Sequence, residues 1–248
     1  MFSSPLCVKD AEKIIVATSI PSAFANSVFQ TRFTTHNADQ KIDEVMHVFK
    51  KKQVPMLWYV TPNSQPQNLE QHLKKCGLQL GYEFHGMAVD LQLELKEEQP
   101  KPSSLKIIRV TAEAQFSDWI DIQFQVYGLP TDRLHEALLP LLKRGLQDNS
   151  WIFFLAFLDD KPVGASLGRY IEKELKQKVV GIFLVAVVQE ARKQGIGGHI
   201  TLAPLLEGKN RGFRMGALYA TEMGYPIYLR LGFHDWFKFP CYSWSPSS

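Results

Sequence analysis

The chain has 248 residues, of which 45% are hydrophobic and 21% charged, a balance typical of a globular protein with a sizeable core. A formal net charge of +3 without a long run of Lys and Arg is too weak to indicate a nucleic-acid-binding surface. No stretch approaches the roughly 20 apolar residues of a membrane span, and the start lacks a signal-peptide pattern. We therefore expect a cytoplasmic protein without nucleic-acid or membrane partners.

The cysteines and histidines give no sign of a metal site or a disulfide framework. Cys7, Cys76 and Cys241 are widely spaced and odd in number, which favours reduced thiols. The histidines show no H-x-x-x-H pattern and no Cys/His ligand spacing. We therefore expect no bound metal.

A polar stretch at residues 96–104 divides the sequence into two halves. Apart from two prolines it holds no apolar residue, which is typical of an exposed connector. We predict a first domain at residues 1–98, a linker at 99–105 and a second domain at 106–248.

Hydrophobic periodicity predicts alternating strands and helices in both halves. In the first half we expect strands at 14–19 and 55–60, helices at 39–51 and 68–76, and paired strands within 78–95. In the second half we expect a strand at 106–110, helices at 112–127 and 132–146, a hairpin at 151–158 and 163–170, and a strand at 179–188. A helix should follow after a glycine-rich turn, then a strand at 216–221, a short helix to residue 231, and two strands within 233–244. The strand at 179–188 carries no polar side chain, so we expect it to be buried in the sheet. This order predicts a mixed α/β layered domain.

The turn after that strand has the composition of an anion site. Gly195, Gly197 and Gly198 let a ligand approach the backbone closely, and the helix that follows presents unpaired N–H groups at its start. Arg192 and Lys193 add positive charge beside these amides. The segment therefore suits a pyrophosphate group.

Two common phosphate motifs do not match. A Walker P-loop needs Gly-Lys followed by Ser or Thr, but Gly197 is followed by Gly198 and His199. A dinucleotide fingerprint needs a third glycine where this chain has Ile200, which disfavours a nicotinamide oxidoreductase. The remaining pattern is Arg-x-x-Gly-x-Gly, at Arg192, Gly195 and Gly197.

A second motif follows at residues 224–233. It contains Tyr228-x-x-x-Gly232-Phe233, with Pro226 suited to a first helical turn and Gly232 to a helix end. In order and spacing the two motifs resemble those of the GNAT acyltransferase superfamily over roughly residues 106–244. The resemblance implies a mixed, mostly antiparallel sheet flanked by helices, an α/β (α+β) fold.

The first half resembles the degenerate partner domain of tandem GNAT proteins. The segment from Trp58 to Leu69 is similar to the Trp-x-Val-x-Pro-x-Ser-x-Pro stretch of such partners, yet the half has no Arg-x-x-Gly-x-Gly turn. The helix ending in Gly77-Leu78 parallels the one ending in Gly232-Phe233, which is compatible with a duplication. We therefore expect two tandem GNAT-like domains with one cofactor site.

The resemblance implies a set of residues that bind acetyl-CoA, the expected cosubstrate. Backbone groups of the central strand would contact the pantetheine arm, and the amides of the glycine turn would hold the pyrophosphate. The implied contacts are Val185, Val187, Arg192, Lys193, Gln194, Gly195, Ile196, Gly197, Gly198, Thr221 and Tyr228.

The resemblance also implies how the chemistry would run. Tyr228 matches the family's general acid, because a phenol is protonated at neutral pH and can protonate a departing thiolate. The Val187 N–H matches the oxyanion donor. The strand at 179–188 has no carboxylate to act as general base, so Glu222 and His199 are the local candidates.

The implied function is N-acetyl transfer from acetyl-CoA to a primary amine of a small molecule or protein, by direct attack in a ternary complex. The alternative is a non-catalytic module that binds acyl-CoA or another partner through a GNAT fold. Acceptor contacts could come from Trp119, Tyr127, Asp132 and Arg133. The quaternary state would be a monomer or a homodimer.

Pro204 should kink or shorten the helix after the turn.

Overall fold

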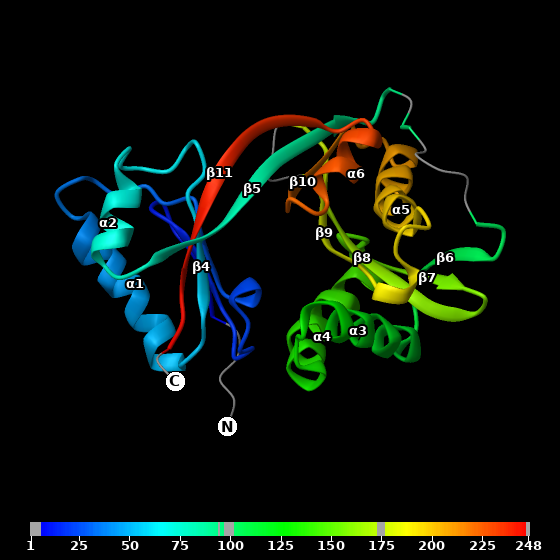
Figure 1. Ribbon diagram of the computed structural model, residues 1–248, viewed down its shortest axis with the longest axis horizontal. Helices are drawn as coiled ribbons and strands as arrows, with labels where there is room; N and C mark the ends of the chain where they lie inside the picture. Colours follow the sequence, from blue (N-terminus) through cyan, green and yellow to red (C-terminus); the bar gives the residue numbers. More distant parts are fainter. Residues whose placement is uncertain (1–5, 94, 97–101, 173–176, 247–248) are drawn as a thin grey trace. The chain divides into compact units, whose positions relative to one another are not determined.

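A computed structural model describes residues 6–93, 95–96, 102–172 and 177–246. The chain forms two compact units: Met1–Phe84 with Phe237–Ser248, and His85–Trp236 (Figure 1). These bounds differ from a division at residues 99–105, because strands β5 (Gln79–Asp90) and β11 (His234–Trp244) each begin in one unit and end in the other. The predicted linker lies outside the described residues at 99–101, and Leu105 already begins strand β6.

The first unit is a sheet with two helices packed side by side, α1 and α2 (Figure 1). Its strand order is β1-β2-β3-β4-β11, in which β3 and β4 run parallel and the other neighbours antiparallel. The elements are β1 Leu6–Lys9, β2 Ile14–Ala17, β3 Ser27–Phe29, α1 Ala38–Lys52, β4 Met56–Tyr59 and α2 Leu69–Lys75.

The predicted helices and the strands at 14–19 and 55–60 are confirmed within a few residues, but the paired strands at 78–95 are wrong. This segment forms the single strand β5. Gly81 does not make a turn in it; a Cβ there would lie 2.8 Å from Ser243 Oγ, so this glycine allows close packing. Strands β1 and β3 were not predicted.

The second unit has the strand order β5-β10-β9-β8-β7-β6, with β10 and β9 parallel and the other neighbours antiparallel. Figure 1 shows α3 and α4 on one face of this sheet and α5 and α6 on the other. The elements are β6 Leu105–Arg109, α3 Glu113–Tyr127, α4 Thr131–Asp148, β7 Trp151–Leu158, β8 Lys161–Ile171, β9 Val179–Val187, α5 Ile196–Asn210, β10 Met215–Ala220 and α6 Tyr225–Arg230.

The predicted element order of this half is confirmed up to its last segment, where one strand replaces the two expected within 233–244. β11 runs unbroken from His234 to Trp244. Pro240 lacks an N–H, but its carbonyl accepts a hydrogen bond from the Val60 N–H at 3.1 Å, so the strand continues through it.

Aromatic side chains fill the core between α3 and the sheet of the second unit. Phe116, Trp119 and Phe153 are fully buried, and the Phe153 ring meets both others edge-on, at 5.3 and 5.1 Å between centroids. Trp119 also donates to the Ser166 carbonyl at 3.1 Å. Trp119 is therefore a core residue and does not line an acceptor site as proposed from the sequence. None of the described helices is long and apolar enough to cross a membrane.

We expected Pro204 to kink or shorten the helix after the turn, but α5 continues through it to Asn210, so the proline does not shorten the helix. Proline has no N–H for the carbonyl four residues earlier, that of Ile200. The hydroxyl of Ser166, fully buried on β8, donates to this carbonyl at 2.9 Å. Gly168 makes room for the proline, because a Cβ there would lie 2.9 Å from Pro204 Cβ. Strand β8 therefore supplies the hydrogen-bond donor that the proline lacks.

The two units share one helix-ending motif. The N–H of Leu78 bonds to the Leu73 carbonyl after α2, and the N–H of Phe233 bonds to the Tyr228 carbonyl after α6, each at 3.0 Å. The glycines before them, Gly77 and Gly232, have φ of 86° and 96°. These are paired Schellman-type ends, each followed by a long strand.

We predict that Ser166→Ala lowers the free energy of unfolding by about 1–2 kcal/mol, because the buried Ile200 carbonyl loses its donor. In a Pro204→Ala background the same change should cost less, since an alanine at that position restores a backbone N–H to the carbonyl. Urea unfolding of both backgrounds measures this, with Ser117→Ala on the exposed side of α3 as the control. Equal losses in the two backgrounds would contradict the pairing.

Candidate functional site at the splayed strands

Strands β9 and β10 pair only at their beginnings. Their parallel register covers Val179 to Gly181 of β9, whereas β8 accompanies β9 as far as Val187. The register with β8 shifts between Ala165 and Leu167, opposite Leu184, whose φ is 50°. This combination is a β-bulge. Beyond Gly181, β9 therefore has no described strand partner on its β10 side.

Three side chains satisfy carbonyl groups of this part of β9. Gln123 Nε2 donates to the Leu184 carbonyl at 3.0 Å, and the Tyr127 hydroxyl donates to the Val185 carbonyl at 2.5 Å. From the other end of the site, Arg192 Nε donates to the Val187 carbonyl at 3.1 Å. Side chains thus take the place of a neighbouring strand.

The N–H of Val187 points toward the open side of β9. The next N–H, that of Val188, bonds to the Val163 carbonyl at 3.0 Å and therefore faces β8. Because successive N–H groups along a strand alternate in direction, the Val187 N–H faces away from β8. The strand lies inside the sheet as expected, with Val180 and Ala186 buried, but it is not buried throughout, since Phe183 is 46% exposed.

The glycine turn opens α5 at the same end of the sheet. Lys193 and Gly195 have φ of 64° and 73°, and Gly195 is the residue before the first helical turn. The amides of Ile196, Gly197 and Gly198 therefore begin the helix, where N–H groups have no intrahelical partner. A Cβ on Gly197 would come no closer than 3.6 Å to the protein, so nothing in the fold itself requires a glycine there.

Positive charge lies beside these amides. Arg192, Lys193 and Gln194 are exposed, and the helix N-terminus adds partial positive charge. An anion placed here would meet backbone donors and charge together.

Tyr228 on α6 lies between the glycine turn and α3. Its hydroxyl hydrogen-bonds Thr201, whose own hydroxyl donates to the Gly197 carbonyl at 2.8 Å. Burial raises the pKa of Tyr228 well above its usual range, and the neighbouring Tyr127 raises it further. Tyr228 is therefore a neutral phenol across the physiological range.

The remaining candidates differ in their exposure and contacts. Glu222 is exposed in the turn before α6, and the Thr221 hydroxyl accepts the Gly224 N–H at 3.3 Å. His199 is buried in α5. Arg133 pairs with the exposed Asp132, Nε to Oδ2 at 3.8 Å.

Sequence reasoning missed two polar residues of this cluster, Gln123 and Thr201. Both are fully buried. Each stands on a helix face otherwise occupied by core residues, and a polar residue in such a position is the signal that could have identified them.

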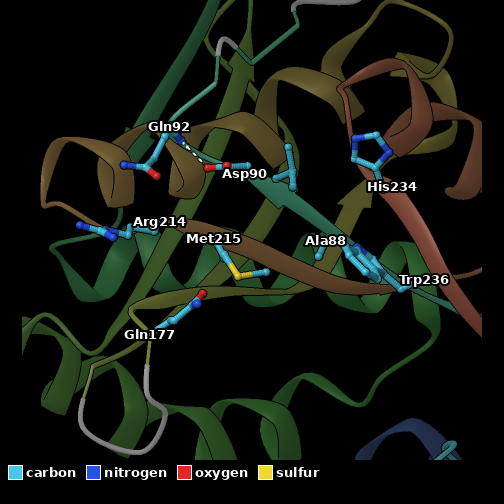
Figure 2. Close-up of a pocket in the computed structure, with 9 residues that line it drawn as sticks. Ala88, Asp90, Gln92, Gln177, Arg214, Met215, His234 and Trp236 are labelled. Carbon is cyan, nitrogen blue, oxygen red and sulfur yellow. Dashed lines mark hydrogen bonds between the residues drawn. The ribbon is translucent and has the colours of Figure 1, made fainter.

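A cavity of the second unit lies elsewhere. It has a volume of about 320 Å³ and includes Ala88, Asp90, Arg214, Met215 and Trp236 in its lining (Figure 2). Figure 2 shows Met215 at the beginning of β10, whereas the splay opens toward the other end of that strand. This cavity is therefore separate from the glycine turn.

The family model of the acetyltransferase (GNAT) family matches residues 114–233. That span includes α3, the splayed strands, the glycine turn and α6. No curated protein matches the sequence.

Solved structures with a similar fold cover nearly the whole chain. A GCN5-related N-acetyltransferase from Kribbella flavida superposes with a TM-score of 0.70 at 14% identity, over 99% of this chain and 91% of that one. One from Sphaerobacter thermophilus gives 0.63 at 16% identity, over 94% and 80%. A tandem GNAT protein from the clavulanic acid biosynthesis pathway gives 0.60 at 11% identity, over 100% and 86%. Identities this low concern the fold alone, and they confirm the predicted fold class.

Proposed function

We propose that the second half of the chain, of which residues 114–233 match the model of the acetyltransferase (GNAT) family, transfers an acetyl group from acetyl-CoA to a primary amine of a small molecule or protein. The proposal rests on three features that lie together in the second unit. The splayed end of β9 and the glycine-opened start of α5 lie at the same end of the sheet, with Tyr228 bonded to Thr201 beside them.

The glycine turn supplies the phosphate site of this proposal. The N–H groups of Gln194 through Gly198 hold the pyrophosphate, and Arg192 and Lys193 add charge. The fit is supported by Gly197, where the fold leaves room for a side chain and the sequence supplies none. A ligand backbone contact explains that choice.

The pantetheine arm binds along the open edge of β9, where Val185 and Val187 offer backbone groups. Thr221 contributes from the end of β10, where its hydroxyl accepts the Gly224 N–H and still has its own O–H to donate. The acetyl thioester then lies between the two strands.

The chemistry needs a free amine, an oxyanion donor and an acid. The amine nitrogen attacks the thioester carbonyl carbon, the Val187 N–H stabilises the oxygen, and Tyr228 gives its proton to the departing sulfur. Glu222 remains a candidate base, but its side chain is exposed and its carboxylate is therefore not held in one orientation by packing.

A non-catalytic acyl-CoA-binding module is the second candidate, favoured by the absence of a carboxylate on β9. Thiol release with an amine separates the two, because a module binds acetyl-CoA without consuming it.

We expect acetyl-CoA to bind one-to-one in calorimetry and Gly197→Glu to weaken binding at least about 100-fold, because its carboxylate blocks and repels the pyrophosphate. The Gln147→Glu variant, exposed on α4, makes the same charge change and should bind as wild type does. Wild type that binds no acetyl-CoA would overturn the proposed function.

We expect Tyr228→Phe to lower kcat about 10²–10³-fold with little change in KM for acetyl-CoA, since only proton donation is lost. Packing against Phe233, whose ring centroid lies 5.8 Å away, is retained. Because burial raises the Tyr228 pKa, wild type should keep this proton up to at least about pH 10, with no loss of kcat from its ionisation below that pH. A variant as fast as wild type at saturating substrates would refute the acid role.

We expect Tyr127→Phe to tighten CoA binding roughly 2–10-fold, because the Tyr127 hydroxyl holds the Val185 carbonyl that pantetheine needs. Adenosine 3′,5′-bisphosphate has no pantetheine arm, so its affinity should not change. Calorimetry with both ligands measures this. Weaker CoA binding in the variant would mean that Tyr127 supports the bound state instead of competing with it.

A further inference from the structure

An Asp–His pair lies beside the splay, outside every motif of the sequence. His85 Nδ1 and Asp235 Oδ2 are 2.6 Å apart, and the two residues are 150 positions apart in the chain. Asp235 also hydrogen-bonds the phenol of Tyr225, so two contacts fix its carboxylate. The side chains are 16% and 27% exposed, which leaves them open to solvent or a ligand.

The strand register places His85 beside the end of β10 that parts from β9. His85 lies opposite Ala220, at the end of β10. Ala220 lies three residues beyond Ala217, the last β10 residue that pairs with β9, and so belongs to the splayed end of β10. His85 therefore stands beside the splayed end of β10, on the strand next to the gap in which the thioester would lie.

His85 also shares a sheet face with Tyr228. Val89, on the same side of β5 as His85, faces Gly216, where a Cβ would touch Leu205 of α5. The ring centroids of His85 and Tyr225 are 4.1 Å apart. Tyr225 and Tyr228 are three residues apart on α6 and therefore neighbours on its surface.

We propose that His85, oriented by Asp235, is the general base of the proposed transferase. The contact to Nδ1 leaves Nε2 as the nitrogen that accepts a proton, and the Asp235 carboxylate stabilises the imidazolium that forms. This assignment depends on the proposed function and supplies the base that β9 lacks.

The proton balance gives each group one task. An alkylamine arrives as an ammonium ion and gives its first proton to His85 Nε2, which passes it to water. The free nitrogen forms the C–N bond as the C–S bond breaks, and Tyr228 protonates the sulfur. The second nitrogen proton returns to the Tyr228 phenolate, so each turnover releases one proton.

Titratable groups near His85 also affect how kcat/KM depends on pH. Asp235 of β11 and Tyr225 of α6 face it, and its β10 neighbour is Ala220, which does not titrate. The readout therefore compares matched variants and two nucleophiles at each pH.

The test measures thiol release from acetyl-CoA by the full chain with tyramine, which is charged at neutral pH, and with methoxyamine, which is not. We expect His85→Gln to lower kcat/KM for tyramine about 100-fold at pH 7, with the deficit shrinking as pH rises and tyramine loses its proton unaided. With methoxyamine the loss should be under about 10-fold, because no ammonium proton has to be removed. Asp235→Asn should fall between wild type and His85→Gln.

Controls separate this role from folding and binding. His234→Gln, on the exposed neighbouring position of β11, should turn over as wild type does, and all variants should bind acetyl-CoA with wild-type affinity. An equal loss with both nucleophiles, or no loss, overturns the assignment of His85 while the transferase stands. Wild type that binds acetyl-CoA but releases no thiol with either amine overturns the transferase and the base together.

Discussion

The bulge at Leu184 is the constraint on which the proposed site depends. It lets β9 follow β8 to Val187 while β10 parts from β9 after Gly181. A strand edge without a partner is costly when buried, so its polar groups need other partners. The side chains of Gln123, Tyr127 and Arg192 provide them, and this explains why polar residues converge on an otherwise apolar strand.

That arrangement links three helices to one short stretch of backbone. Tyr127 belongs to α3, Arg192 precedes α5, and Tyr228 of α6 is joined to α5 through Thr201. In the free protein the side chains of Tyr127 and Arg192 hydrogen-bond the backbone carbonyls of β9. A ligand with amide and thioester groups would replace some of these internal hydrogen bonds with its own. In the proposed transferase, cofactor binding is therefore a replacement of internal hydrogen bonds by similar external ones.

Strand exchange between the halves brings the Asp–His pair into the second unit. β5 follows α2 of the first half and ends beside β10, while β11 follows α6 and ends beside β4. The two helices before these strands end in the same Schellman-type geometry, at Gly77 and Gly232. The strand that follows the first of these helix ends places His85 in the second unit. The first half of the sequence therefore supplies a side chain next to the proposed site.

The sequence by itself determined what short-range physics controls. The helix and strand periods, the glycine turn that opens a helix, the helix end at Gly232 and the GNAT motifs all depend on residues within about one turn or one strand of each other. The two long strands were misjudged because a local pattern does not show whether a glycine such as Gly81 turns the chain or admits a neighbour. Only the tertiary structure decided which side chains cap β9 and which carboxylate meets His85. Those contacts join positions 58 and 150 residues apart, and nothing in the local pattern encodes a hydrogen bond whose partners meet only after the sheet has formed.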